Sequence, residues 1–468
     1  MRDELVPRKE EILGWIERIY AQGVRRPGYP ADRWAEELCA ERFRALGLEA
    51  VRLEPALLPY WEPRSWSLHA SGAGGEIELP CFPLPHSAPT EEIELELLPY
   101  DPKSPASVKG KASLHETALL RIPPASPVTG GRAVEEVKGG LEMSVSPGGR
   151  LFDARGSFEG ALQVLPFGPR FQWVMEPAIE AGAAAFIGAL TDYPGDSCQY
   201  YVPYDGVARP IPGLWIRGSD GARLRSMLRA GSVRVRLRVD SLRREITCYN
   251  AVGELPGADR EWVVIGSHHD GPWSSAVEDA SGMALVFAQA AYWSKLPASE
   301  RPHRLVFLLN CGHMAGAAGC HAFLDAHAAD LERIVLEIHL EHAAREFVER
   351  EGALVPSGEP ETRWFFTSRN PALESSVAEA LQAEKLDRSL IVPPDVFGEQ
   401  PTTDGGPFHR RGVPLVNYLT APFYLFDEID RMDKIDGASL VPVTRAAVRL
   451  VESTKGVSAA SMRSGMAV

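Results

Sequence analysis

The sequence has no hydrophobic run long enough to cross a bilayer. Apolar stretches such as Leu305-Val-Phe-Leu-Leu309 are short, whereas a membrane-spanning helix needs about 20 apolar residues in succession. The first residues, MRDELVPRKEEILGW, contain no apolar core of signal-peptide length. None of the six cysteines belongs to a Cys-x-x-Cys pair, and no Asn-x-Ser/Thr sequon occurs. These absences predict a cytoplasmic protein that has no disulfide scaffold and no membrane partner.

Positive charge is scarce relative to negative charge. There are 49 Lys and Arg residues against 63 Asp and Glu residues, which gives a formal net charge of −14. A negative surface repels nucleic acid and anionic lipid, so neither is expected as a partner. The sequence also lacks the motifs G-x-S-x-G, G-x-x-x-x-G-K-[ST] and H-E-x-x-H. Their absence argues against a serine hydrolase with a nucleophile elbow, a P-loop protein and an H-E-x-x-H metalloprotease.

The composition is that of a globular protein. Of the 468 residues, 45% are hydrophobic and 24% are charged, and the length suggests two or three domains. From residue 261 onward, short apolar strands alternate with helical patterns, which indicates an α/β domain with a largely parallel sheet. The expected strands are 262–265, 304–309, 334–340, 364–367 and 414–418, and the expected helices are 282–293, 319–329, 373–384 and 441–451.

The first half of the chain is predicted to be richer in strands. Two helical patterns lie within residues 9–48, a strand is expected over 48–58, and residues 60–115 favour strands with loops. Residues 116–245 look like a separate module. Alternation over 233–239 predicts a strand with one buried face.

Histidines are concentrated late in the sequence, and nine of the 12 lie between His268 and His409. Gly266-Ser-His-His-Asp270 follows the strand expected over 262–265, and Glu278-Asp-Ala-Ser-Gly282 begins the next helix. Imidazole nitrogens and carboxylate oxygens at one place suit zinc or another first-row divalent metal. Asp270 is expected to orient the His268 ring without binding the metal itself. The alternative is a loop of solvated charges.

These segments and three further motifs resemble the M28 family of zinc aminopeptidases and carboxypeptidases. The likeness is greatest to glutamate carboxypeptidase II and the transferrin receptor, which carry an inserted protease-associated domain. It implies a mixed, mostly parallel sheet flanked by helices, with an N-terminal part over 1–115, a β-rich protease-associated-like insert over 116–245 and a metallopeptidase core over 246–468. The three further motifs are Cys311-Gly-His-Met-Ala-Gly-Ala-Ala-Gly319, Ile338-His-Leu-Glu341 and Thr403-Asp-Gly-Gly-Pro-Phe-His-Arg-Arg-Gly-Val-Pro414.

The resemblance implies a metal site whose ligands depart from the family pattern. The family holds one zinc with a His, a bridging Asp and a further Asp, and these positions are His268, Glu278 and Glu341 here. Each longer Glu keeps the oxygen donor and shifts the metal. Asp279 and His342 are neighbouring donors that could substitute if the longer side chains miss.

The second zinc of the family is expected to be lost. Its Glu ligand corresponds to Met314, and its late His falls at about Phe426. A thioether and a phenyl ring cannot replace these donors. One divalent metal is therefore expected, most simply zinc, with manganese or iron as alternatives.

His313 stands where the family has its catalytic Glu. Three roles remain open for it: a general base, a further metal ligand or a structural residue. His269 is expected to point to the opposite side of the strand, although it stays a possible metal ligand or pocket residue. His339 is expected to be a core residue. His342, Asp404 and His409 are candidates for the pocket, although an Asp-Gly-Gly turn alone would explain Asp404.

Two functions follow from this pattern. The first is a metal-dependent hydrolase of amide or peptide bonds in small substrates, in which His268, Glu278 and Glu341 hold one metal and His313 accepts a proton. The second is a non-catalytic binding or assembly protein that has lost its second metal site. A small-molecule or short-peptide partner is expected in the first case, and the family likeness makes a homodimer plausible.

Overall fold

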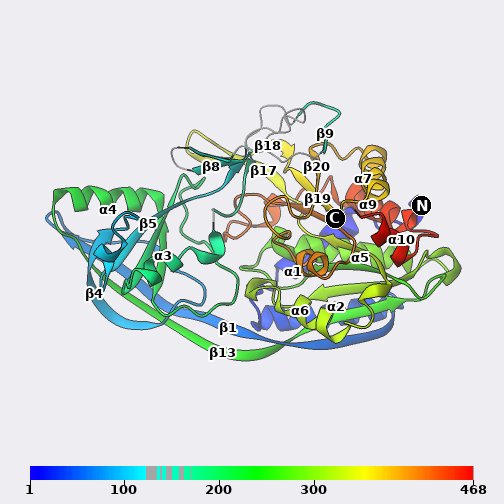
Figure 1. Cartoon of the computed structure of the whole chain (residues 1–468), viewed down its shortest axis with the longest axis horizontal. Coiled ribbons are helices and arrows are strands. Elements are labelled where there is room, and N and C mark those ends of the chain that lie inside the picture. The colour runs from blue at the N-terminus through cyan, green and yellow to red at the C-terminus, as the bar shows by residue number, and fades with distance from the viewer. Residues whose placement is uncertain (123–133, 138–139, 144–149, 158–162, 169, 467–468) are drawn as a thin grey trace.

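The computed structural model describes residues 1–466 except 123–133, 138–139, 144–149, 158–162 and 169. In these ranges a 15-stranded sheet runs through the molecule, and helices cover its C-terminal half (Figure 1). None of the helices in the same ranges combines the length and the apolar composition needed to cross a bilayer. The six cysteines are all described, and they are buried free thiols.

The C-terminal half of the sheet confirms the α/β prediction. Its neighbouring strands run in the order β13-β15-β14-β16-β21-β19-β20, and β15, β14, β16 and β21 are mutually parallel. The strands are β13 Arg234–Leu255, β14 Trp262–His268, β15 Arg304–Asn310, β16 Ile334–Leu340, β19 Arg363–Thr367, β20 Ser389–Val392 and β21 Leu415–Thr420. The helices are α1 Lys9–Tyr20, α2 Pro30–Ala45, α5 Gly282–Trp293, α6 Ala318–Ala326, α7 Pro371–Glu384, α8 Gly405–Arg410, α9 Leu440–Ser453 and α10 Ala459–Ser464.

The other end of the sheet forms a second lobe. Parallel pairing joins β4, β5, β11 and β12 there, and α4 lies against β11 and β12. The predicted division of the chain at residues 115 and 245 stays a prediction. The lobe contains β2 Gly75–Glu78, β3 Cys81–Pro83, β4 Thr90–Pro99, β5 Ala112–Ala118, β11 Ala185–Thr191, β12 Gly213–Arg217, α3 Glu176–Glu180 and α4 Gly218–Ala230.

Two long antiparallel strands connect the lobes. β1 spans Glu49–Gly72 and pairs along its length with β13, as the blue and green ribbons at the bottom of Figure 1 show. The separate strands predicted over 48–58 and 233–239 are therefore parts of longer ones. Prolines 55, 59 and 63 do not end β1, because proline is tolerated on the unpaired side of an edge strand.

Smaller elements lie beside the main sheet. A two-stranded antiparallel sheet consists of β17 Arg345–Arg350 and β18 Ala353–Pro360. The short strand β9, Arg150–Phe152, extends the main sheet beyond β20. A four-stranded sheet is formed by β6 Arg121–Ile122, β7 Val134–Val137, β8 Gly140–Met143 and β10 Gln163–Val164.

The strand order determines where a site can form. The carboxyl ends of β15, β14 and β16 lie next to one another at one edge of the sheet, which is the usual place for ligands in such folds. Every residue of α5 is buried, as expected for a helix that is apolar on all sides. The segment that leads into α5 is therefore held against the same edge.

Candidate metal centre

Three neighbouring strands carry the candidate residues. β14 ends at His268, β15 ends shortly before His313, and β16 ends directly before Glu341 and His342. All four side chains are buried. The predicted proximity of these residues follows from the parallel order of the three strands.

Glu278 reaches the same place from the segment Ala276–Ser281 that precedes α5, in which Glu278 and Asp279 have non-helical backbone angles. The Asp430 carboxylate accepts hydrogen bonds from the backbone N–H groups of Val277 and Glu278, both at 2.8 Å. The peptide bond between Glu278 and Asp279 is cis. The segment places the Glu278 carboxylate among the histidines.

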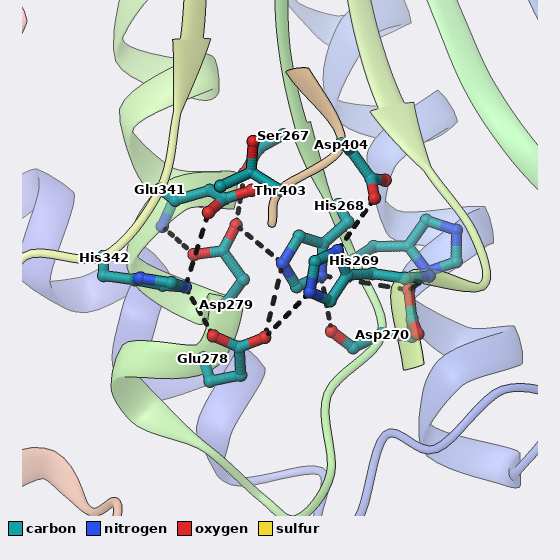
Figure 2. Close-up of polar contacts among 12 residues, drawn as sticks. Ser267, His268, His269, Asp270, Glu278, Asp279, Glu341, His342, Thr403 and Asp404 are labelled. Carbon is teal, nitrogen blue, oxygen red and sulfur yellow. Dashed lines mark hydrogen bonds and ion pairs between the residues drawn. The ribbon is translucent and has the colours of Figure 1, made fainter. Parts of the chain in front are cut away.

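The donor atoms converge on Glu278, as Figure 2 shows for His268 and His342. Glu278 Oε1 lies 3.5 Å from His268 Nε2 and 3.7 Å from His313 Nε2. Glu278 Oε2 contacts His342 Nε2. The rings of His268 and His313 stack with a centroid distance of 4.0 Å.

Each of the three histidines has its Nδ1 atom fixed by an acceptor. His268 Nδ1 lies 2.9 Å from the main-chain oxygen of Asp270, and His342 Nδ1 lies 2.7 Å from that of Thr420. His313 Nδ1 lies 2.8 Å from Asp404 Oδ1. Since these oxygens accept, Nδ1 donates in each ring, and the Nε2 lone pair of the neutral ring faces the centre.

The arrangement fits a metal ion. His268 Nε2 is buried without a hydrogen-bond partner in the described ranges. Imidazole nitrogens and carboxylate oxygens are the donors that zinc and related metals prefer. Two overlapping groups have their donor atoms within 4.8 Å of one another, namely His268, Glu278 and His313, and His268, Asp279 and His342.

Glu341, a predicted ligand, belongs to neither group. Its Oε1 atom pairs with His339 Nε2 at 3.0 Å, and His339 Nδ1 pairs with Glu337 Oε1 at 2.9 Å. Its Oε2 atom lies 3.8 Å from His342 Nε2. Burial alone would raise the pKa of Glu341, but His339 and the other histidines lower it. Glu341 is thus an ionised neighbour whose Oε1 atom lies at ion-pair distance from His339 Nε2, although neither atom has a hydrogen bond within the described ranges.

Charge separates His268 from the other two rings. Burial lowers the pKa of His268 well below its ordinary value, and the neighbouring rings lower it further. Burial alone would also lower the pKa of His313 and His342. Nearby carboxylates, with Asp404 foremost for His313 and Glu278 foremost for His342, raise both pKa values to about 10. His268 therefore keeps a free lone pair near neutral pH. A cation bound beside Glu278 would lower the pKa of His313 and would displace the proton of His342.

Asp270 lies beside His268 as expected, with Oδ1 3.9 Å from His268 Nδ1, but it contacts the ring through its main chain. Its carboxylate does not hydrogen-bond to His268 and instead accepts from the backbone N–H groups of His313, at 3.0 Å, and Met314, at 2.8 Å. The main-chain oxygen of Asp270 orients His268. The residue therefore links the loop after β14 to the loop after β15.

Asp279 is close to the centre but already engaged. It accepts hydrogen bonds from Ser267 Oγ and, at 3.1 Å, from the Gly282 N–H group. Burial raises its pKa well above the ordinary value. Because both of its oxygens already accept hydrogen bonds, Asp279 is a weaker candidate ligand than Glu278.

Two predicted pocket residues lie outside the centre. His269 Nδ1 pairs with Asp32 Oδ1 at 2.8 Å, and its Nε2 lies 3.0 Å from the Tyr249 main-chain oxygen. Both nitrogens are occupied on the far side of the strand, as alternation predicts. His409 is half-buried on α8 and is not among the residues that line the cavity beside the centre.

An apolar cavity of about 220 Å³ adjoins the centre. Glu278, His313, Glu341 and His342 contribute the polar end, and Tyr204 stacks on His313 with a centroid distance of 5.3 Å. Phe426, at the predicted position of the late His ligand, lines this cavity, and the loss of the second metal stays a prediction. The remaining wall is largely aromatic and aliphatic, including Phe167, Phe171, Trp364, Phe366, Phe397 and Leu419.

Sequence reasoning missed Arg25, which holds the loop that carries Glu278. Its guanidinium group is fully buried and donates to the main-chain oxygens of His269 at 3.2 Å, Ser275 at 2.8 Å and Glu278 at 3.3 Å, and also to Ser274. No local pattern could have indicated this role, since the partners are about 250 residues away in the sequence.

Replacing Arg25 with methionine is expected to lower the free energy of unfolding by about 3 kcal/mol or more, because charge-assisted hydrogen bonds are worth roughly 1.5–3 kcal/mol each. Urea denaturation measures the change. The exposed Arg44 on α2 provides a matched control, and Arg44→Met is expected to change stability by no more than about 0.5 kcal/mol. Equal effects of the two substitutions would contradict the role given to Arg25.

The geometry can be compared with known proteins. The model of peptidase family M28 matches residues 250–451, a range that contains His268, Glu278, His313 and His342. No curated protein matches the chain.

Solved structures show the same fold over nearly the whole chain. The aminopeptidase from Aneurinibacillus sp. strain AM-1 is 16% identical with a TM-score of 0.65, and the match covers 97% of this chain and 96% of that one. For the peptidase M28 precursor from Shewanella amazonensis the identity is 19%, the TM-score 0.69 and the coverage 94% and 92%. BSAP, a zinc aminopeptidase from Bacillus subtilis, is 16% identical with a TM-score of 0.65, and the match covers 95% of each chain. The fold is therefore zinc-aminopeptidase-like.

Proposed function

We propose that the chain is a metallohydrolase of the M28 family that cleaves amide or peptide bonds in small substrates with one divalent metal ion. The observation that carries this proposal is the buried His268 Nε2 atom, which has no hydrogen-bond partner in the described ranges and faces the carboxylates of Glu278 and Asp279 at 3.5 and 3.8 Å. The family match over residues 250–451 supports the same function. Zinc is the first choice, with manganese or iron as alternatives.

The geometry favours one metal ion over two. Both groups of donor atoms depend on His268 Nε2, and the single lone pair of a neutral imidazole nitrogen binds one metal. Two metals would need a shared carboxylate and a separate ligand set on each side. Met314 is buried and Phe426 lines the cavity where such a set would be needed.

A divalent ion at this place would supply Lewis-acid activation of a scissile carbonyl and of a water molecule. His313 is the residue that can move the proton. Its Nδ1 donates to Asp404 at 2.8 Å, and its ring lines the cavity. Asp404 fixes the ring orientation and stabilises the imidazolium, so Nε2 can accept a proton and return it to the leaving amine.

The cavity indicates the substrate class. Its volume of about 220 Å³ is below the range of about 300–1,000 Å³ typical of sites for drug-sized ligands. The aromatic wall favours an uncharged apolar group next to the scissile bond. Short peptides and small amides with one apolar side chain are therefore the proposed substrates.

The test combines metal content with turnover. Protein purified without chelators is expected to contain close to one zinc, manganese or iron per chain by mass spectrometry, and to hydrolyse aminoacyl or acyl amides of Leu and Phe faster than those of Asp and Lys. Removing the metal with a chelator should abolish turnover, and adding it back should restore it. Only trace metal after native purification would contradict the proposal.

A non-catalytic binding protein is the second candidate. It is favoured by Met314 and Phe426, which supply no hard donor for a second metal. Stoichiometric metal without turnover on any amide, ester or peptide of the panel would support it. Four further expectations stay predictions: the protease-associated-like insert over 116–245, the likeness to glutamate carboxypeptidase II and the transferrin receptor, a homodimer and a cytoplasmic location.

A further inference from the structure

We infer that His342 is the third protein ligand of the metal, in place of Glu341. This inference rests on the proposed function and replaces one of the ligands implied by the family pattern. The resulting set is His268, Glu278 and His342, which combines Glu278 of one donor group with His342 of the other around the shared His268.

Glu341 lies against His339 and belongs to neither donor group. Its Oε1 atom is 3.0 Å from His339 Nε2, and His339 is anchored by Glu337 at 2.9 Å. A metal on Glu341 Oε1 would have to compete with this buried pair. The other oxygen of Glu341 lies 3.8 Å from His342 Nε2, whereas His342 Nε2 contacts Glu278 directly.

The His342 ring is oriented with Nε2 toward Glu278. Its Nδ1 is tied to the main-chain oxygen of Thr420 at 2.7 Å, which leaves the Nε2 lone pair of the neutral ring for a metal. Nε2 contacts Glu278 Oε2 and lies within 4.8 Å of a donor atom of His268. The Nε2 atoms of His342 and His268 are buried, and neither has a hydrogen bond in the described ranges. Figure 2 shows His342 and His268 on either side of Glu278.

The proposed ligand set is typical of catalytic zinc. Two histidines and one glutamate form a recurring ligand set of catalytic zinc, with the fourth position left open for water or substrate. His313 then remains free on the cavity side, held by Asp404. A set with two nitrogens also favours zinc over magnesium, calcium or manganese.

The experiment measures metal affinity rather than activity. Zinc affinity is determined by competition with a chromophoric chelator, and cobalt-loaded protein gives a visible spectrum that reports the ligand set. His342→Asn keeps an N–H group that can donate to Thr420 and lacks the distal nitrogen. It is expected to weaken zinc binding by about 100-fold or more, beyond the 10–100-fold typical of a residue that only supports a ligand, and to change the cobalt spectrum.

Two variants serve as comparisons. Glu341→Gln is expected to bind zinc within about tenfold of the wild type, because a residue that only neighbours a ligand has at most a modest effect. His321→Asn, on the exposed face of α6, should leave both readouts unchanged. His342→Cys, which offers a thiolate, is expected to recover affinity and shows that a loss in His342→Asn does not arise from misfolding.

The outcomes separate the inference from the proposed function. If Glu341→Gln loses the metal while His342→Asn retains it, the inference is overturned and the hydrolase proposal stands. If metal binding depends on His342 but the wild type cleaves no amide, the inference stands and the proposed function fails. If His313→Ala loses the metal together with His342→Asn, His342 remains a ligand and His313 is not the proton acceptor.

Discussion

Replacing His313 with alanine is expected to lower kcat by about 10²- to 10⁴-fold, the range typical for loss of a general acid–base group. Metal content and KM should change little, because the ring lines the cavity and the metal is proposed to be held by His268, Glu278 and His342. Steady-state kinetics together with metal analysis of the same preparation measure the effect.

The partner of His313 gives a graded version of the same test. Asp404→Asn removes the carboxylate that lies 2.8 Å from His313 Nδ1 and is expected to lower kcat by about 10- to 100-fold, as found for groups that orient an active histidine. His321→Ala, on the surface of α6, controls for histidine loss in general. Full activity in His313→Ala would exclude His313 as the proton acceptor.

Replacing His268 with alanine is expected to remove the metal and to lower activity by at least about 10³-fold, because a metal ion contributes several kcal/mol to a hydrolytic transition state. His268 is the donor common to both groups of candidate ligands, so no remaining pair can replace it. The measurement is metal content per chain and kcat/KM in zinc-supplemented buffer.

The same variant has a thermal signature. A ligand that binds only the folded state stabilises it by about 4 kcal/mol at 1,000 times its Kd, so zinc should raise the Tm of the wild type and a chelator should lower it. His268→Ala should respond to neither. A zinc-dependent Tm in His268→Ala would place the metal elsewhere, and an unchanged Tm in the wild type would favour the non-catalytic alternative.

Much of the fold near the site could be predicted because its elements are short and strongly patterned. The helix over 282–293 and the strand over 334–340 have the predicted bounds. The strand over 262–265 continues to His268, which places that histidine at the sheet edge. The long strands β1 and β13 were predicted only in part, because proline and charged residues end a local pattern but not a strand that is paired along its length.

The sequence was enough to predict which residues lie together in the site. It predicted less well which partner each side chain contacts. His268 and Glu278 lie together as the resemblance implies. The contact between Glu341 and His339 joins side chains two positions apart that lie on the same side of the chain. The sequence contains both residues but does not reveal this contact. Asp404 reaches His313 across 91 positions of sequence, and no local pattern encodes such a contact.

The most direct test of the account is an anomalous difference map at the zinc absorption edge from crystals of protein purified without chelators. One peak per chain is expected, bounded by His268 Nε2, Glu278 and His342 Nε2, with His313 outside bonding distance. Two peaks, or one peak held by Glu341 and not by His342, would contradict the ligand assignment. No peak at these residues would contradict the claim that the chain is a metallohydrolase.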